Sequence, residues 1–281
     1  MQMAYSLNIR GRLRTWSEPQ VMGIVNLTPD SFFGASRARG VRAVLKRTEK
    51  MLKEGMNILD LGAMSSRPGA QLISAEEEWR RLEKPLKGIV KAFPELLVSV
   101  DTFRAEVAER CVEAGASIVN DISGGSFDEK MFATVGRLQV PYILMHLSSP
   151  LQAWEQSGAR PEKPAEVSLI PYFSEKISQA RQAGIHDIIL DPGFGFDKTL
   201  EQNYAVLNRL RDLSIFDMPV LVGMSRKSML YKLLGTTPEK ALNATTAVHM
   251  VALLHGAAIL RVHDVKEAVE CVKIYRQLWN L

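Results

Sequence analysis

The stretch LLVSVDTFRAEVAERCVEAGASIVND, residues 96–121, contains a strand, a helix and a second strand in one run. Residues 96–101 and 117–121 are apolar and rich in Val and Ile up to their last positions, which is typical of strands buried on both faces. Residues 105–114 repeat their apolar side chains at helical spacing, and Gly115 ends that helix. A helix between two buried strands is the βαβ unit, so this stretch predicts an α/β protein with a parallel sheet.

The same alternation runs through the rest of the chain. Predicted strands occupy residues 21–26, 57–61, 96–101, 117–121, 142–146, 187–191, 220–223 and 259–263. Predicted helices occupy residues 41–54, 75–92, 105–114, 128–138, 167–183, 199–213, 238–255 and 265–278. Eight such pairs in about 250 residues favour a (β/α)₈ TIM barrel over an open doubly wound sheet, and no Gly-x-Gly-x-x-Gly sequence follows the first strand. We therefore predict one TIM-barrel domain over residues 1–281, with an N-terminal β-hairpin at 5–16 that plugs the amino-terminal end of the barrel.

Composition excludes several classes of protein. Hydrophobic residues make up 46% and charged residues 23% of the chain, the balance of a folded domain and not of a disordered one. No apolar run is long enough to span a bilayer, and residues 1–16 lack the apolar core of a signal peptide, so we expect a cytoplasmic protein without membrane contact. Cys111 and Cys271 lie far apart in helical segments, which indicates neither a disulfide framework nor a cysteine metal site.

The charge pattern also bears on the kind of partner. The formal net charge is +4, but Lys and Arg are interspersed with acidic residues and form no basic run. We therefore expect no nucleic-acid partner. An excess this small fits an anionic small-molecule substrate.

Hydrogen-bonding side chains end six of the predicted strands, where a buried strand ordinarily finishes in apolar or turn-forming residues. Four of them belong to strands whose carboxyl ends should meet at one rim: Asp60, Asp101, Asn120 and Asp191. Buried carboxylates need a metal ion, cationic side chains or ligand N–H groups as compensation. Two kinds of site remain open at this point: that of a hydrolase with a hard metal ion, and a pocket for a flat heterocycle that presents N–H donors.

Cationic side chains gather at other predicted strand ends. Residues 223–228 follow a strand and open a helix, where free backbone N–H groups beside Lys227 favour an anion. Arg67 lies in the long loop 63–74, and Arg261 and His263 face the same side of the last strand. We call the opening of the barrel at the carboxyl ends of its strands the mouth. Acids in one part of the mouth and these cations in another predict a ligand with an N–H-rich ring at one end and a phosphate at the other. The loops at 27–40, 63–74 and 147–166 are the expected lids.

Seven short motifs point to one family. They are NLTPDSF at 26–32, SRPGA at 66–70, SVDT at 99–102, NDI at 120–122, DPGFGF at 191–196, SRKS at 225–228 and RVHD at 261–264. All seven lie at predicted strand ends, in the order found in dihydropteroate synthases. The chain therefore resembles that family from residue 21 to residue 264, nearly its whole length.

The resemblance implies a transferase of folate synthesis. Such an enzyme condenses 6-hydroxymethyl-7,8-dihydropterin diphosphate with 4-aminobenzoate and gives 7,8-dihydropteroate and diphosphate. The resemblance further implies Mg²⁺ as cofactor, bound together with the diphosphate at Asn26. It also implies a homodimer, for which the apolar segment 238–254 is a candidate interface.

Site residues carry over position by position. Four match residues that hold the pterin, in a pocket that also contains Asp60: Asp101, Asn120, Asp191 and Lys227. Three match diphosphate contacts: Arg67, Arg261 and His263. Three correspond to the surroundings of aminobenzoate: Pro68, Phe196 and Ser228. The predicted catalytic residues among them are Asp101, Lys227, Arg261 and His263.

Three loops depart from the family pattern. FFGAS at 32–36 lacks the Asp of the usual Ser-x-Asp-Gly-Gly continuation, GAMSSR at 62–67 lacks the Glu of Gly-Gly-Glu-Ser-Thr-Arg, and residues 145–150 lack an Arg/Lys-Gly pair. These changes spare the pterin pocket and bear on lid closure and turnover. Two alternatives to a synthase stay open: a pterin-dependent methyltransferase, which needs no anion site like SRKS, and a non-catalytic pterin-binding paralogue.

Overall fold

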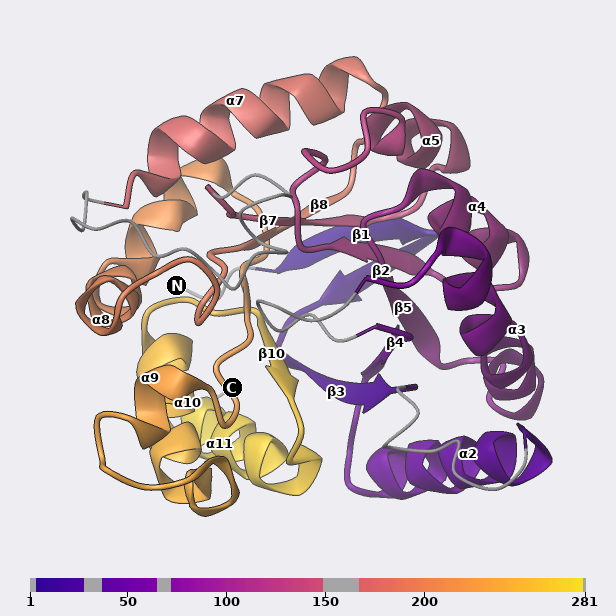
Figure 1. The fold of residues 1–281 in the computed structure, drawn as a ribbon. Coiled ribbons are helices and arrows are strands. Elements are labelled where there is room, and N and C mark those ends of the chain that lie inside the picture. The colour runs from indigo at the N-terminus through magenta and orange to yellow at the C-terminus, as the bar shows by residue number, and fades with distance from the viewer. Residues whose placement is uncertain (1–3, 28–36, 65–71, 149–166, 280–281) are drawn as a thin grey trace.

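Eight parallel strands form a ring at the centre of the molecule, and helices lie around it (Figure 1). The structure is a computed structural model that describes residues 4–27, 37–64, 72–148 and 167–279. The strands of the ring are β3 (Gln20–Asn26), β4 (Ile58–Gly62), β5 (Leu97–Asp101), β6 (Ile118–Asp121), β7 (Tyr142–Met145), β8 (Ile188–Asp191), β9 (Leu221–Val222) and β10 (Ile259–Val262). The helices are α2 (Arg37–Lys53), α3 (Ala75–Ala92), α4 (Ala105–Glu113), α5 (Met131–Leu138), α7 (Leu169–Gln182), α8 (Leu200–Asn208), α9 (Ser228–Tyr231), α10 (Leu242–Leu254) and α11 (Val265–Leu278), with 3₁₀ turns η1 (Leu210–Phe216) and η2 (Pro238–Lys240).

The ring closes between β8 and β9. Backbone hydrogen bonds order the strands β8-β7-β6-β5-β4-β3-β10-β9, and every neighbouring pair is parallel. The two outer strands meet through a parallel bridge between Leu190 and Val220, and the Leu190 N–H donates to Pro219 O at 2.9 Å. The predicted TIM barrel is confirmed, and each predicted strand coincides with an observed one.

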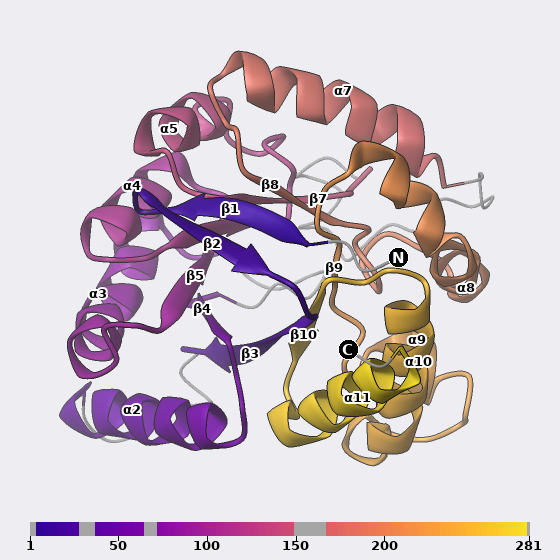
Figure 2. The same cartoon turned by 180° about the vertical axis from the view of Figure 1, so that it is seen from behind.

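Alternate residues of each strand point into the barrel, because successive side chains of a strand face opposite sides. The lowest interior layer is apolar and consists of Met22, Ile58, Ile118, Ile143, Ile189, Leu221 and Ile259. It packs against Leu7, Ile9 and Trp16. These three belong to the antiparallel hairpin of β1 (Tyr5–Ile9) and β2 (Arg12–Trp16), which lies across the amino-terminal end of the barrel (Figure 2). The predicted N-terminal plug is therefore confirmed.

The other strand residues face the helices, and Asp121 is one of them. Its carboxylate accepts hydrogen bonds from Tyr142 Oη at 2.6 Å and from the Ser123 backbone N–H at 2.7 Å, and it is fully buried. Asn120, one residue earlier, points into the barrel instead. Of the two polar residues that end β6, only Asn120 is available to a ligand.

Four predicted helices have clearly different boundaries, and the first of them, predicted at 41–54, begins at Arg37. The segment predicted at 199–213 is split, because the backbone turns at Arg209 and a 3₁₀ turn, η1, follows α8. The segment predicted at 238–255 begins as the 3₁₀ turn η2 before α10. The helix predicted from residue 128 begins at Met131, because the Asp128 carboxylate accepts from the backbone N–H groups of Lys130 and Ala105. No helix in the described ranges is long and apolar enough to cross a membrane.

Candidate active site

Arg261 joins two carboxylates at the floor of the barrel mouth. Its Nε donates to Asp60 Oδ2 at 2.6 Å, and its Nη2 donates to Asp101 Oδ2 at 2.8 Å. Asn120 Nδ2 also donates to Asp60 Oδ2, at 3.2 Å. The four residues come from β4, β5, β6 and β10, and all four point inward.

One cation for two buried carboxylates leaves an excess of negative charge. Asp60 is 0% exposed, and Asp101 and Arg261 are nearly buried. Burial raises the pKa of Asp101 to about 7, although Arg261 opposes the shift. Burial alone would lower the pKa of Arg261, but the two carboxylates outweigh it and raise that pKa above its usual range. Arg261 therefore stays charged, and Asp101 is the group that gains or loses a proton near neutrality.

Two polar atoms beneath this cluster lack a partner. Asp60 Oδ1 and Ser99 Oγ are buried without a hydrogen bond to any residue in the described part of the chain. Asp60 and Ser99 are register neighbours on β4 and β5. Buried polar atoms in native proteins are nearly always satisfied, by protein, water or ligand. The floor of the mouth is thus able to accept hydrogen bonds from a ligand.

Lys227 forms the opposite wall of the mouth. Its Nζ donates to the Phe194 carbonyl and lies 4.4 Å from the centroid of the Phe196 ring. Burial lowers the pKa of Lys227 to about 7, and Asp191 opposes that shift. Asp191 is buried at the end of β8, and its Oδ1 accepts from the Gly193 N–H at 2.8 Å. Burial raises the pKa of Asp191, with Lys227 acting against the rise.

Arg226, next to Lys227, has a structural role. Its Nε and Nη2 pair with the Asp264 carboxylate at 2.7 and 3.0 Å, and its Nη1 donates to Pro238 O at 2.8 Å. Its φ of 55° lies in the left-handed region that non-glycine residues rarely occupy. These bonds turn the chain so that Lys227 faces the mouth. The helix that follows, α9, has four residues, so the predicted helix-dipole contribution to anion binding is small.

The loop between β8 and α8 holds Lys227 from the other side. Gly193 has a φ of 71°, and a Cβ atom there would lie 2.2 Å from His146 O. Gly195 has a φ of 76°, and a Cβ atom there would lie 2.6 Å from Lys227 Cδ. Only glycine fits either position, so this loop packs directly on β7 and on Lys227.

Asn26 lies beside Asp101 at the mouth. A Cβ atom added to Gly62 would be 3.5 Å from Asn26 Oδ1 and 3.6 Å from Asp101 Oδ2, so both oxygens border the same space. Both are hard oxygen donors of the kind that Mg²⁺ prefers. Among the described residues, no cluster of three or more His, Cys, Asp or Glu is placed to hold a metal ion.

The structure brings most of the predicted site residues together. Those at the mouth are Asn26, Asp60, Asp101, Asn120, Asp191, Phe196, Lys227 and Arg261. Ser228 follows Lys227 as the first residue of α9. His263 is exposed just beyond β10, and its backbone N–H donates to Ser225 Oγ at 3.3 Å. Arg67 and Pro68 lie outside the described residues.

One expectation was wrong. The acids and the cations were predicted to occupy separate parts of the mouth, but Arg261 lies between Asp60 and Asp101. The physical reason is burial, because two carboxylates away from water need a counter-ion within hydrogen-bonding distance.

An apolar wall was missed in the sequence. Phe103, Ile122, Met145 and Leu147 form a buried cluster, and Phe196 packs against it. Their inward direction follows from the period of two along each strand, so Met145 was open to prediction two residues after Ile143. The Phe194 carbonyl that accepts from Lys227 leaves no signal in the sequence, because every residue has a carbonyl.

The geometry agrees with comparisons to known proteins. A family model described as pterin binding enzyme matches residues 22–263. The chain belongs to the pterin-binding enzyme family. Within that family, dihydropteroate synthase of Escherichia coli strain K12 is 39% identical over 260 residues, which cover 92% of this chain and 91% of that protein. Dihydropteroate synthase of Bacillus subtilis is 37% identical over 265 residues, covering 92% of this chain and 88% of the relative.

Solved structures of pterin-binding enzymes share the fold. Xanthomonas albilineans dihydropteroate synthase with 4-aminobenzoic acid superposes with a TM-score of 0.88 at 34% identity, covering 99% of both chains. The Coxiella burnetii dihydropteroate synthase in complex with pteroic acid gives a TM-score of 0.86 at 35% identity, covering 98% of both. The resemblance to dihydropteroate synthases that the seven motifs indicated is confirmed.

Replacing Arg261 by Met should destabilise the fold. Asp60 would be left as a buried charge without its cation, and the loss of one partner of a buried pair destabilises by about 3–5 kcal/mol. Adding Asp60→Asn in the same chain should restore part of the loss, because it removes that charge. Urea titration gives the free energies of unfolding. Arg137→Met, in an exposed pair with Glu109, is the control and should change stability by less than about 1 kcal/mol. Equal changes in the free energy of unfolding for Arg261→Met and the control would contradict the stabilising role of the Arg261 ion pairs.

Lys227 should titrate near pH 7. Its amine is protonated and unreactive below that pH and neutral and nucleophilic above it. Asp191→Asn should lower the pKa further, since Asp191 stabilises the ammonium form. Competitive labelling with acetic anhydride between pH 5.5 and 9, with the Lys227 peptide read by mass spectrometry, measures both values. Labelling that still rises at pH 9 without a plateau, as expected for a lysine with the ordinary pKa of 10.5, would place Lys227 in solvent.

Proposed function

We propose that the protein is a cytoplasmic enzyme that condenses 6-hydroxymethyl-7,8-dihydropterin diphosphate with 4-aminobenzoate, using one pterin-binding barrel domain over residues 1–281. The products are 7,8-dihydropteroate and diphosphate. The observation that carries the proposal is the acceptor-rich floor of the mouth, built by Asp60, Asp101 and Asn120 around Arg261, with Lys227 on the facing wall. The matched relatives that cover most of both chains are dihydropteroate synthases, which supports the same reaction.

The floor suits the N–H groups of a pterin. Asp101, Asn120 and Asp191 present side-chain oxygens, and Asp60 Oδ1 is a further acceptor without a partner among the described residues. The apolar wall around Met145 offers a surface for the ring face. A flat heterocycle with several N–H donors would satisfy the buried carboxylates and remove its own apolar faces from water.

The chemistry separates charge, and the mouth stabilises both of the charges that develop. The bond between the pterin methylene carbon and the diphosphate oxygen breaks, and its electron pair leaves with the diphosphate. Positive charge develops on the methylene and the ring, where the fixed carboxylates of Asp101 and Asp191 stabilise it. The arylamine nitrogen of aminobenzoate forms the new bond to carbon and then loses a proton to solvent. Because the arylamine is already nucleophilic, the site needs no strong base.

The departing diphosphate needs cations. Within the described part of the chain, Arg261 uses Nε and Nη2 on carboxylates, which leaves Nη1 to donate to the leaving group. We place Lys227 and Arg67 on the same anion, and His263 there as a neutral hydrogen-bond donor, because burial and Arg261 lower the pKa of His263 to about 4. Ser228, Phe196 and Pro68 lie around aminobenzoate in this proposal. His263 is exposed at the rim of the mouth, where it could contact the diphosphate as this group leaves the site.

The residues present fit Mg²⁺ in one particular way. Mg²⁺ is usually bound by one or two protein oxygens together with substrate phosphates and water, and not by an all-protein cage. Asn26 Oδ1, in the space it shares with Asp101, is such an oxygen. When bound, Mg²⁺ supplies positive charge that neutralises the diphosphate.

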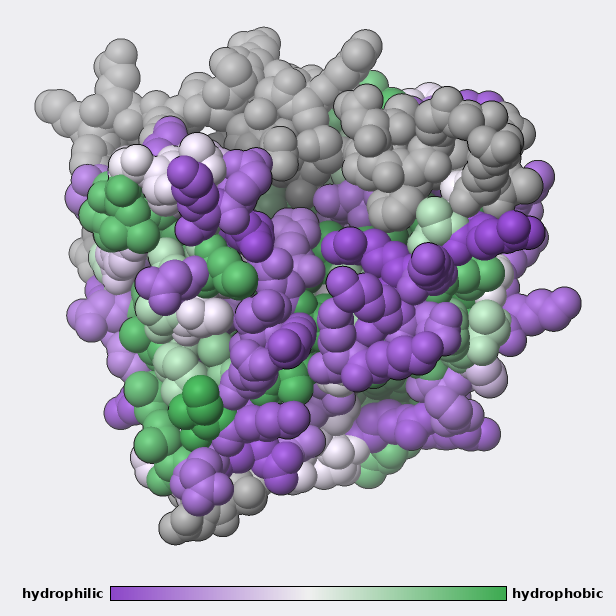
Figure 3. All heavy atoms as spheres, turned by 90° about the horizontal axis from the view of Figure 1, so that it is seen from below, coloured by the Kyte–Doolittle hydropathy of each residue, from purple (hydrophilic) through white to green (hydrophobic). Residues whose placement is uncertain are grey.

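A homodimer is part of the proposal. Large apolar side chains are exposed along α10, α11 and the residue after it: Val251, Leu254, Ile274, Leu278 and Trp279. Figure 3 shows apolar surface gathered over the side of the molecule where α10 and α11 lie. A second copy of the chain would cover these side chains, which a helix packed only on its own barrel leaves in water.

Sedimentation velocity tests the dimer. The protein should sediment at twice its chain mass of 31.3 kDa, and Leu278→Asp should shift it toward the monomer by placing a charge in the apolar interface. Leu13→Asp, on the exposed hairpin, is the matched control and should remain dimeric. A wild-type protein that sediments as a monomer at micromolar concentration would exclude this assembly.

Diphosphate release tests the reaction. With pterin diphosphate, aminobenzoate and Mg²⁺, the protein should release diphosphate in step with dihydropteroate. Asp101→Asn should lower kcat/KM roughly 10²-fold, the range for loss of one charge-stabilising group. Glu83→Gln, in an exposed pair on α3, should leave kcat/KM unchanged. Pterin diphosphate binding without release would favour a non-catalytic paralogue, and binding of pterin regardless of the diphosphate would favour a methyltransferase.

A further inference from the structure

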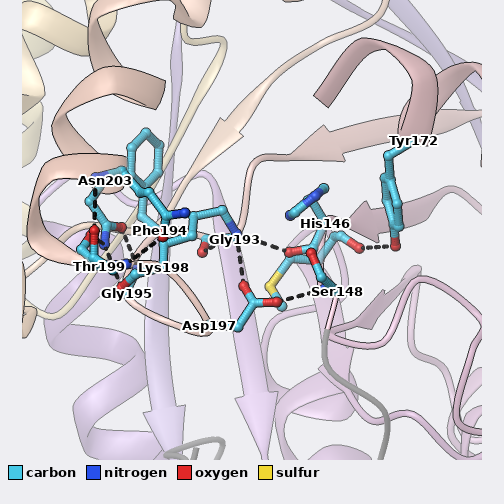
Figure 4. Close-up of polar contacts among 12 residues, drawn as sticks. His146, Ser148, Tyr172, Gly193, Phe194, Gly195, Asp197, Lys198, Thr199 and Asn203 are labelled. Atoms are coloured by element: carbon cyan, nitrogen blue, oxygen red, sulfur yellow. Dashed lines mark hydrogen bonds and ion pairs between the residues drawn. The ribbon is translucent and has the colours of Figure 1, made fainter. Parts of the chain in front are cut away.

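Another buried ion pair, between Lys198 and Asp197, lies within the β8–α8 loop, outside the mouth. Lys198 is 2% exposed, and its Nζ donates to Gly193 O at 3.1 Å, to His146 O at 3.4 Å and to Asp197 Oδ1 at 3.1 Å. Asp197 is nearly buried as well, and its Oδ2 accepts from the Ser148 N–H at 2.6 Å. Figure 4 shows Asp197 lying between Lys198 and Ser148. The pair therefore ties the loop to the carboxyl end of β7.

The opposite side of the same loop is tied to α8. Asn203 Oδ1 accepts from the Gly195 N–H at 2.7 Å, and its Nδ2 donates to Thr199 O at 2.6 Å and Lys198 O at 3.1 Å. Residues 193–198 are thus fixed from both flanks. Two glycines at positive φ would otherwise leave this loop with large conformational freedom.

Three consecutive residues of this fixed loop contact Lys227. The Phe194 carbonyl accepts from its ammonium group, Gly195 lies against its side-chain carbons, and the Phe196 ring faces its Nζ. A shift of the loop by an ångström would move all three contacts together. The placement of Lys227 therefore depends on what holds the loop.

Burying the charges of a lysine and an aspartate has a large desolvation cost. Two ions taken out of water recover their desolvation energy only when geometry is good, so such a pair adds little net stability. It does fix one arrangement, because Lys198 finds three oxygens only when His146, Gly193 and Asp197 are all in place. The ion pair is therefore better explained by the single loop conformation that it fixes than by a gain in stability.

We propose that Lys198 and Asp197 are positioning residues for Lys227, acting through the β8–α8 loop without touching the substrate. The assignment rests on the proposed function, in which Lys227 binds the pterin diphosphate. Lys198 also acts on the site through its charge. The charged groups that act on Lys227 are Asp191, Arg261, Lys198 and Asp101, and Lys198 is among those that lower its pKa.

Two variants separate positioning from folding. Lys198→Met removes the cation and leaves a buried Asp197, whereas Lys198→Met with Asp197→Asn removes both charges, so that no buried carboxylate is left unpaired. Lys87→Met, an exposed lysine paired with Glu83 on α3, is the matched control. We expect both loop variants to raise the KM for pterin diphosphate about tenfold, with a smaller change in kcat, because Lys227 acts in substrate binding. The control should match the wild type.

The pH behaviour of Lys227 supplies a readout that does not need turnover. Loss of the Lys198 charge and freer access of water to a loosened loop both favour the ammonium form. Competitive labelling should therefore show the pKa of Lys227 rising from about 7 in both loop variants and not in Lys87→Met. Where turnover is measured, the alkaline limb of kcat/KM should move to higher pH in parallel.

The outcomes are distinct. A wild-type protein without diphosphate release overturns the proposed function, while the labelling experiment still decides the positioning role. A folded double variant with wild-type KM and an unchanged Lys227 pKa overturns the positioning role alone. Failure of the double variant to fold would make the pair structural and would overturn it as well.

Discussion

One guanidinium shared by two buried carboxylates governs the architecture of the mouth. Arg261 meets Asp60 and Asp101 only when β10 has paired with β3, so the charged floor exists only once the last strand of the chain has joined the first three strands of the ring. The cluster also carries more negative than positive charge. Burial raises the pKa of Asp101, Arg261 opposes that rise and Asp60 adds to it, and carboxylate oxygens remain able to accept hydrogen bonds from a ligand. Fold and ligand chemistry therefore depend on the same three side chains.

Much of the fold was open to prediction from sequence, because it rests on periodicity. Buried parallel strands have a period of two and a limited length, and the polar residues at their ends must meet at one edge of a barrel. Asp60, Asp101 and Asn120 were found in this way. The position of Arg261 between the acids was not, because a long side chain can reach several neighbours and only the folded structure selects among them.

Adjacent residues show where local sequence is insufficient. Asn120 points into the barrel while Asp121 bonds Tyr142 in the helix layer, and Lys227 faces the mouth while Arg226 pairs with Asp264. The first pair separates by strand alternation and was predictable. The second depends on a positive φ at Arg226, for which the sequence gives no glycine as a signal. Lys198 likewise looks like an ordinary surface lysine until the loop folds over it.

The hairpin of β1 and β2 affects how ligands reach the interior of the barrel. With the amino-terminal end of the barrel covered by Leu7, Ile9 and Trp16, a ligand would reach the interior from the carboxyl ends of the strands. Under the proposed function, the pterin would enter from this side and rest on the floor, and the second substrate would enter from the same side. The packing of the hairpin at one end of the barrel thus decides from which end a ligand enters.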